Sequence, residues 1–396
     1  MPGPCLRQVR IIILFPARPD PDTGHRKHSG VSILFDCIVV GGGIIGMLTA
    51  RQLRIQGMEV LLLDRSATGT ESSWAGGGIL SPLYPWRYPE PVSELAAWSH
   101  RNYEQLAEAL HQESGIDPEW TRSGLLMPAC DETEQAMQWA HRYNANLQQI
   151  HGIQQIRMLE TGLALEVNDA LWMPEVAQIR NPRMVQALKG SLQHYGVEIA
   201  EHEEVTSLET DADRVTHVVT NKRKISAQTI VLCAGAWTAR ILESAGLEVK
   251  VEPVRGQMLV FKARPGIIQH IILYEGRYLI PRRDGRVLMG STMEYVGFDK
   301  ATTEMARAEL QEKALEIVPE LARYPIEKHW AGLRPGSPTG IPYIGKHNKY
   351  NNLYFNAGHF RNGVIIGPAS VHVLCSQILG QTADIDPTRF GLMAVH

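Results

Sequence analysis

The chain has 396 residues, 44% hydrophobic and 20% charged, so it is too apolar for a disordered protein and long enough for two or three domains. Lys and Arg (39) nearly balance Asp and Glu (42), and the net charge of −3 excludes a broad basic surface for nucleic acid or anionic membranes. The five cysteines are widely spaced without a C-x-x-C pair, which argues against a disulfide framework and is typical of cytoplasmic thiols. We therefore expect a cytoplasmic protein with a small-molecule ligand, no metal site and no nucleic-acid partner.

Residues 1–34 precede the first clear element. They hold several prolines, a basic run at 26–28 and one apolar block at 11–15, which is far shorter than the about 20 residues that a membrane span needs. We expect a disordered or wrongly assigned extension, with a targeting segment as the weaker alternative. The apolar stretch at 31–50 predicts no membrane span either, because Asp36 and three consecutive glycines interrupt it.

Residues 37–64 carry the order of elements that opens a dinucleotide-binding fold. A buried strand at 37–40 leads into a glycine turn, and residues 47–56 repeat apolar positions at helical spacing until Gly57. A second strand, 58–63, ends in an acidic residue. Strand, turn, helix, strand and acid in this order make a chance match improbable.

The turn itself has the spacing G-x-G-x-x-G, formed by Gly41, Gly43 and Gly46. The first glycine permits a tight turn, the second lets backbone approach a pyrophosphate at the helix N-terminus, and the third lets helix and strand pack closely. Asp64 can accept hydrogen bonds from ribose hydroxyls, and an acid at this position disfavours a ribose 2′-phosphate. The motif alone does not separate NAD from FAD.

Three later features favour FAD. The segment SSWAGGGIL at 72–80 is suited to following the phosphates of a long cofactor, and its Trp, Ile and Leu are unusual for a flexible surface loop. A buried strand within 229–237 ends in Ala-Gly, which in two-domain flavoproteins returns the chain to the cofactor. No second G-x-G-x-x-G follows a strand, so we expect no separate NAD domain.

On these residues the sequence resembles the D-amino acid oxidase family of FAD-dependent amine oxidases, and within it the glycine oxidase branch linked to thiamine biosynthesis. The matching segments are DCIVVGGGIIG at 36–46, SSWAGGGIL at 72–80, TIVLCAGAW at 229–237, PVRGQML at 253–259, YLIPRRDGRVLMGSTME at 278–294, WAGLRPGSPTGIPYIG at 330–345 and GHFRNGVIIGP at 358–368.

The resemblance implies an α/β fold with a Rossmann-like FAD-binding domain and a second, α+β substrate domain on an antiparallel sheet. Strand-like residues 253–262 and 278–291, the latter interrupted by an Asp284-Gly285 turn, fit that second domain. We expect a FAD-binding domain over 35–116, 176–250 and 335–396, and a substrate domain over 117–175 and 251–334.

The resemblance also implies noncovalent FAD, because no cysteine lies where sarcosine oxidases attach their flavin. Val205 matches a family residue whose backbone meets adenine, although periodicity alone makes it a strand core residue. With the glycine-turn residues, the expected cofactor site comprises Gly41, Gly43, Ile44, Ile45, Gly46, Asp64, Arg65, Ser72, Ser73, Gly77, Gly78, Ile79, Val205, His359, Phe360, Arg361, Asn362, Gly363, Val364 and Ile365.

Four residues match the family's substrate site. Arg334 corresponds to the arginine that holds the substrate carboxylate, and its apolar surroundings argue against a surface arginine. Tyr278 corresponds to a tyrosine that supports the same carboxylate; otherwise it is a strand aromatic. Arg361 matches a residue between flavin and substrate. Met293 is expected to line the pocket, although a core methionine is nearly as good an interpretation.

The motifs offer no well-placed His, Asp or Glu as a general base, which favours hydride transfer from the substrate α-carbon to flavin N5. The resemblance implies oxidation of glycine, sarcosine, D-alanine or D-proline by O2, with H2O2 as a product. The imine would hydrolyse to the oxo acid or pass to thiazole synthase, and we expect a homo-oligomer. The alternatives are a D-amino acid or sarcosine dehydrogenase with a quinone or protein acceptor, half of a tRNA-modifying enzyme, or a noncatalytic nucleotide-binding module.

Overall fold

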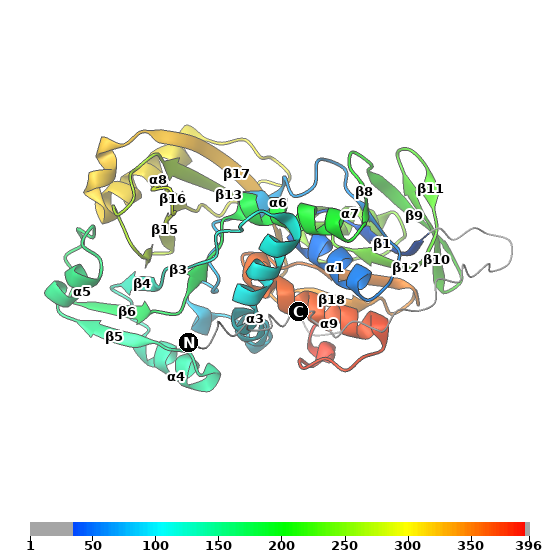
Figure 1. Cartoon of the computed structure of the whole chain (residues 1–396), viewed down its shortest axis with the longest axis horizontal. Helices are drawn as coiled ribbons and strands as arrows, with labels where there is room; N and C mark the ends of the chain where they lie inside the picture. Colours follow the sequence, from blue (N-terminus) through cyan, green and yellow to red (C-terminus); the bar gives the residue numbers. More distant parts are fainter. Residues whose placement is uncertain (1–34, 393–396) are drawn as a thin grey trace, which may run out of the picture.

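The computed structural model describes residues 35–392, so the extension predicted at residues 1–34 lies outside the described residues. Two large sheets dominate them, and they stand at opposite ends of the molecule's longest axis (Figure 1). In Figure 1 the six-stranded sheet lies on the right and the eight-stranded sheet on the left. The predicted combination of a Rossmann-like sheet with a second, largely antiparallel sheet is confirmed.

The six-stranded sheet is parallel except at one edge, where β18 runs antiparallel to β19. In spatial order its strands are β18 (Tyr343–Lys346), β19 (Leu353–Ala357), β12 (Ala227–Leu232), β1 (Phe35–Val40), β2 (Val60–Leu63) and β8 (Glu198–Ala200).

Both faces of this sheet are covered, which explains its continuous apolar strands. Cys37 and Val39 of β1 point into one core and Ile38 and Val40 into the other, because successive side chains alternate. The first core is completed by α1 (Ile44–Ile55), α3 (Glu90–Ser114), α6 (Asn181–His194) and α9 (Gly363–Leu379). The second is completed by β9 (Val205–Asp211), β10 (Arg214–Thr220), β11 (Lys224–Ile225) and α7 (Thr238–Glu243).

The second large sheet is antiparallel except where β14 runs parallel to β4. The hairpin predicted around Asp284 and Gly285 is present. In spatial order the strands are β17 (Ile326–Gly336), β13 (Glu252–Phe261), β16 (Val287–Gly290), β15 (Arg277–Pro281), β14 (Ile271–Tyr274), β4 (Leu125–Pro128), β6 (Asp169–Met173) and β5 (Gln148–His151).

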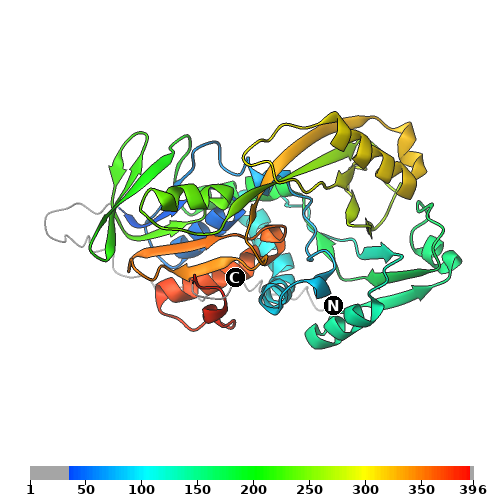
Figure 2. The same cartoon turned by 180° about the vertical axis from the view of Figure 1, so that it is seen from behind.

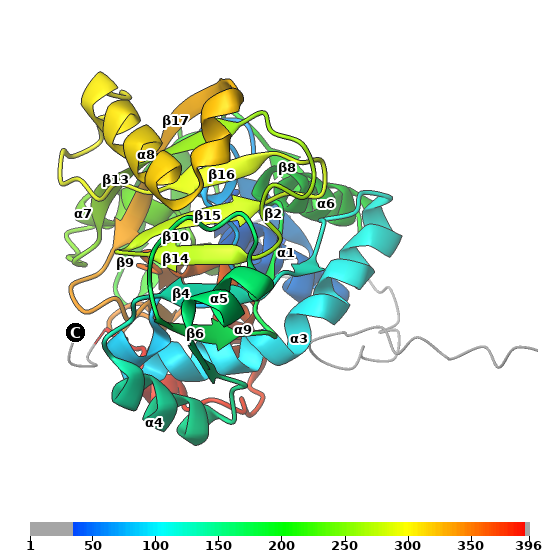
Figure 3. The same cartoon turned by 90° about the vertical axis from the view of Figure 1, so that its left-hand side faces the viewer.

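Helices cover one face of this sheet. On the other face helices cover only a part, and the rest faces the six-stranded sheet. Leu259 and Phe261 pack into a core with α5 (Ile153–Leu159) and α8 (Glu304–Ile317), whereas Met258 and Tyr278 face the other side, with α4 (Thr133–Tyr143). Figure 3, an end-on view, shows α8 and α4 on opposite sides of the strands. Tyr278 therefore stands on the face that meets the first half of the molecule.

Two predicted boundaries need correction. The first helix begins at Ile44 rather than residue 47, since Met47 N already donates to Gly43 O. The second strand begins at Val60 rather than residue 58, because Met58 N still closes the preceding turn on Leu53 O. Residues 72–75, in the segment expected to follow the cofactor phosphates, form one helical turn, α2 (Ser72–Ala75).

The other short elements lie in connections. They are η1 (Pro85–Arg87), β3 (Thr121–Arg122), β7 (Ala177–Gln178), η2 (Gly235–Trp237), η3 (Pro319–Arg323) and η4 (Pro387–Arg389). None of the described helices is long and apolar enough to cross a bilayer.

We propose that the two large sheets mark the two predicted domains. Figure 2, the view from behind, shows the chain passing between them several times, so each half is assembled from separate segments. The predicted boundary at 334/335 falls inside β17, which carries the chain from one half to the other.

Candidate active site

A cavity of about 500 Å³ lies between the two halves. Residues of the six-stranded half line most of it, and the second half contributes Gly256, Met258, Tyr278, Gly332 and Arg334. The predicted site residues that line the cavity are Gly41, Gly43, Ile44, Ile45, Asp64, Arg65, Ser72, Ser73, Gly77, Val205, Tyr278, Arg334, His359, Phe360, Arg361, Gly363 and Val364.

The glycine turn has no room for side chains. Gly41 adopts φ +107°, and a Cβ there would lie 2.4 Å from Cys233 O. A Cβ on Gly46 would lie 1.8 Å from Gly41 O, so only glycine lets α1 start this close to β1. The close approach brings the N-terminus of α1 to the cavity wall.

That N-terminus is open to an anion. Gly43, the N-cap of α1, supplies no side chain, and the first turn holds no acidic residue that would offset the positive end of the helix dipole. Ser73 Oγ accepts a hydrogen bond from Ile44 N at 2.9 Å. Since serine can also donate, a phosphate between Ser73 and the helix end would be well placed.

Asp64 has a task that spacing alone did not predict. Its Oδ2 accepts from Gly42 N at 2.7 Å and its Oδ1 from Ser66 N at 2.8 Å. Burial raises the pKa of Asp64, although these hydrogen bonds oppose the shift. The carboxyl therefore holds the glycine turn in addition to lining the cavity.

Two residues of the cavity wall, Trp237 and Arg240, were missed by the sequence analysis. Arg65 stacks its guanidinium over Trp237, 3.7 Å from the ring centre, and Arg240 lies 3.6 Å from the ring centre of Phe298. Trp237 and Arg240 both line the cavity. Trp237 ends the Ala-Gly segment that the sequence singled out, whereas no pattern pointed to Arg240.

In the wall contributed by β17, Arg334 carries a charge without a carboxylate partner. Its guanidinium donates to Thr292 O at 3.1 Å and to Ser291 Oγ at 2.6 Å, and no described Asp or Glu forms an ion pair with it. Burial lowers the pKa of Arg334, and the nearby charge of Arg361 lowers it further. A buried guanidinium with spare donors is suited to binding an anion from the cavity.

Glycines make space for this arginine and for Tyr278. A Cβ on Gly256 would lie 2.2 Å from both terminal nitrogens of Arg334, and one on Gly290 would lie 2.7 Å from the ring of Tyr278. Tyr278 is 7% exposed, and its hydroxyl contacts Met258 Sδ at 3.9 Å. The backbone of Gly256 and Gly290 therefore restricts where the Arg334 guanidinium and the Tyr278 ring can lie.

The 359–365 segment forms the remaining wall, where Phe360 at φ +46° turns the chain into α9. His359 is 2% exposed with Nε2 3.2 Å from Ser370 Oγ, and burial lowers its pKa to about 3. His359 is therefore neutral near pH 7 and carries no charge into the cavity.

The shift at His359 predicts acid sensitivity. The folded chain favours the neutral ring, so the stabilisation is complete above the unfolded pKa of about 6.5 and is lost as the pH falls toward about 3. Between pH 7 and pH 5 this residue alone should lower the free energy of unfolding by about 2 kcal/mol. His359→Gln should flatten a plot of Tm against pH between pH 7 and pH 5; parallel plots for the wild type and the variant would contradict the assignment.

Six predicted site residues do not line this cavity. Met293 is 51% exposed, in the segment after β16. Gly46 and Ile365 lie behind the wall in α1 and α9, and Asn362 is buried beside α9. Gly78 and Ile79 follow the wall residue Gly77, where a Cβ on Gly78 would meet Ile179 O at 2.0 Å. Their roles in the site stay predictions.

The residues fit FAD. The cavity offers a glycine cradle beside an open helix end, a carboxylate and Val205 on one side, and a cationic pocket in the other half. A dinucleotide with a ring system needs such an elongated arrangement. Among residues 35–392, no group of three or more His, Cys, Asp or Glu side chains is arranged to hold a metal ion.

Comparisons with known proteins agree. The family model described as FAD dependent oxidoreductase (DAO) matches residues 36–377. Glycine oxidase of Pseudomonas aeruginosa is 44% identical over 89% of this chain and 97% of its own length. The bifunctional protein ThiO/ThiG of Synechocystis is 30% identical over 90% of this chain and 54% of its own length. The crystal structure of glycine oxidase from Bacillus cereus superposes with a TM-score of 0.82 and 28% identity, over 88% of this chain and 96% of that chain.

Proposed function

Because the chain belongs to the DAO family of FAD-dependent oxidoreductases, we propose that it oxidises glycine and other small amino acids at the Arg334 end of the cavity. Membership makes it an enzyme that uses FAD and supports amine oxidation as its chemistry. The glycine oxidase of Pseudomonas aeruginosa, with 44% identity over nearly its whole length, supports glycine as the first substrate to test.

The observation that carries this proposal is the guanidinium of Arg334, which lines the cavity without a carboxylate partner among the described residues. Burying a cation without a counter-charge costs free energy, and a substrate carboxylate would recover it. Arg334 would bind the carboxylate through two parallel hydrogen bonds, and Tyr278 would donate a third from its hydroxyl. The clamp leaves the amine and α-carbon of a small amino acid free to point into the cavity.

The chain supplies orientation rather than proton transfer. FAD held by the glycine turn, Ser73 and Asp64 would supply the two-electron oxidation of the amine, with O2 reduced to H2O2. Water would then hydrolyse the imine product to an oxo acid and ammonia. No described carboxylate forms an ion pair with Arg334, and His359 is buried and neutral, so neither offers a base at that position. The substrate should therefore react as the free amine, held by Arg334 and Tyr278.

A D-amino acid or sarcosine dehydrogenase that passes electrons to a quinone or protein acceptor is the alternative within the family. The decisive experiment offers glycine, sarcosine, D-alanine and D-proline to the purified protein in air and measures H2O2 and oxo acid. Peroxide formed in proportion to oxo acid supports the oxidase. Oxo acid formed only with an added artificial electron acceptor supports the dehydrogenase, and no product from any of the four would contradict both.

We propose that the FAD is noncovalent. Of the described cysteines, Cys233 lines the cavity, and burial raises its pKa to about 12, so its thiol is not an available nucleophile. The protein should be yellow, and acid precipitation should release FAD into the supernatant. Yellow colour retained in the washed pellet would contradict this prediction.

We also propose a link to thiamine biosynthesis, by hand-off of the imine to thiazole synthase. The support is the bifunctional relative in Synechocystis, of which this chain matches about half. A cytoplasmic location and a homo-oligomer complete the proposal. Pull-down of the thiazole synthase from the source cell with the tagged protein would test the hand-off.

A further inference from the structure

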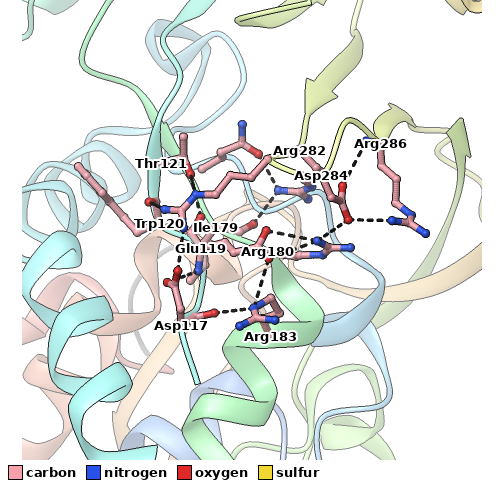
Figure 4. A network of polar contacts seen from close by, with 12 residues as sticks. Asp117, Glu119, Trp120, Thr121, Ile179, Arg180, Arg183, Arg282, Asp284 and Arg286 are labelled. Carbon is pink, nitrogen blue, oxygen red and sulfur yellow. Dashed lines mark hydrogen bonds and ion pairs between the residues drawn. The ribbon is translucent and has the colours of Figure 1, made fainter. Parts of the chain in front are cut away.

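A second arginine without a carboxylate lies behind the cavity wall. Arg282 follows β15 in the turn of the β15–β16 hairpin and is 7% exposed. Its neighbours form ion pairs, as Figure 4 shows: Arg180 and Arg286 both bind Asp284. No described Asp or Glu forms an ion pair with Arg282.

The guanidinium of Arg282 donates its hydrogen bonds to neutral oxygens instead. Nη1 donates to Gln178 Oε1 at 2.6 Å and to Ile179 O at 3.0 Å, and Nη2 donates to Gly77 O at 2.7 Å. Gln178 Nε2 in turn donates a hydrogen bond to Pro281 O at 2.8 Å. Burial lowers the pKa of Arg282 to about 10, so it remains a cation at neutral pH. Burying a cation that binds only neutral oxygens costs desolvation free energy, so we expect these hydrogen bonds to serve a role.

One of these contacts leads to the proposed substrate site. Gly77 lines the cavity, and a Cβ on it would lie 3.1 Å from the ring of Tyr278 and 2.9 Å from Ile280 Cδ1. The ring is also approached by the backbone of Gly290, so both glycines restrict where it can lie. Tyr278 and Arg334 line the same cavity, and the Arg334 guanidinium donates to Oγ of Ser291, the residue next to Gly290.

We propose that Arg282 is a positioning residue for the substrate carboxylate: it holds the Gly77 carbonyl, keeps the Gly77 backbone against Tyr278, and so fixes the tyrosine hydroxyl beside Arg334. This inference rests on the proposed function, because it takes Tyr278 and Arg334 as the carboxylate site. The competing interpretation is that Arg282 merely braces the hairpin against residues 178–179. The two differ in whether substrate affinity or only stability depends on Arg282.

The test uses the FAD-loaded enzyme and glycolate, a carboxylate that lacks the amine, as the binding probe. Glycolate Kd is measured from the change in flavin absorbance, and KM and kcat are measured for glycine. Arg282→Met removes the three hydrogen bonds and keeps most of the apolar stem. Arg283→Met is the matched control, because Arg283 lies on the same turn but binds Asp117, Trp120 O and Thr121.

Arg282→Met should raise glycolate Kd and glycine KM about tenfold or more, the effect of weakening one hydrogen bond to a charged group. The kcat should change less than about threefold, and Arg283→Met should leave Kd and KM within about twofold. Unchanged Kd and KM in Arg282→Met, with only a lower Tm, would overturn the proposal in favour of a brace.

A double-mutant cycle with Tyr278→Phe separates the route through the tyrosine from general damage. Once the hydroxyl is absent, Arg282→Met should add less than about threefold to glycolate Kd. An equal loss in both backgrounds would overturn the proposal. If Arg282→Met loses FAD, Arg282→Lys decides: intermediate affinity supports the proposal, and wild-type affinity overturns it. A wild-type enzyme that neither binds glycolate nor oxidises glycine would instead contradict the proposed function.

Discussion

Arg334→Leu should lower glycine oxidation at low substrate concentration by about 30-fold to several thousand-fold. The leucine removes a charge-assisted pair in a desolvated pocket, where the loss of one partner costs about 2 to 5 kcal/mol, and each 1.4 kcal/mol is about tenfold in rate. Arg334→Lys should recover only part of the activity, since an ammonium cannot reproduce the two parallel donors. The measurement is kcat/KM for glycine, compared with a small amine that lacks a carboxylate, such as ethylamine.

Three controls distinguish loss of the clamp from loss of the fold. FAD content should be unchanged, because the glycine turn and Asp64 belong to the other half of the cavity wall. The Tm of the substrate-free enzyme should not fall, since the substitution removes an unpaired buried cation. Gly256→Ala should mimic Arg334→Leu, because its Cβ would stand 2.2 Å from the guanidinium nitrogens. Equal losses with glycine and ethylamine would show that Arg334 is structural.

Local patterns predicted the first half of the fold well. In β1 and α1, strand, glycine turn and helix are adjacent in sequence, so spacing alone indicates their contacts. The strands beside β1 were harder to place, because β12 and β19 come from residues 227–232 and 353–357. Only the family resemblance indicated that these distant segments return to one sheet.

The sequence predicted site residues whose own side chains carry the chemistry. It did not predict residues that act only by positioning another side chain. Arg334 stands in a recognisable motif, whereas Gly256 matters only because its backbone lies under that guanidinium. Arg282 lies in the matching segment 278–294, but it stands beside Arg283, and nothing in the sequence indicated which of the two is buried. Long-range hydrogen bonds of this kind, separated by about 100 to 200 residues, appear only after the chain is folded.

Gly46→Ala should produce a colourless protein with a Tm lower by several degrees. The new Cβ would lie 1.8 Å from Gly41 O, an atom that cannot move aside, because Gly41 N is bonded to Leu63 O at 2.8 Å and the neighbouring Val40 O accepts from Cys233 N at 2.7 Å. The alanine therefore fits only if α1 moves away from β1. We expect this overpacking to lower the free energy of unfolding by about 1 to 3 kcal/mol and to displace the helix end proposed to bind the pyrophosphate.

Gly367→Ala is the matched control for this prediction, because Gly367 lies in α9 where that helix packs on α1. Its Cβ would meet only side-chain ends, Ile45 Cδ1 at 3.2 Å and Leu48 Cδ1 at 3.6 Å, which can rotate away. Alanine also has a higher helix propensity than glycine, so Gly367→Ala should keep its FAD and a Tm close to that of the wild type. The measurements are the ratio of flavin to protein absorbance and the Tm from circular dichroism. If Gly46→Ala binds FAD as the control does, the close approach of α1 to the glycine turn is not what creates the pyrophosphate site, and Ser72, Ser73 and Arg65 become the residues to test in its place.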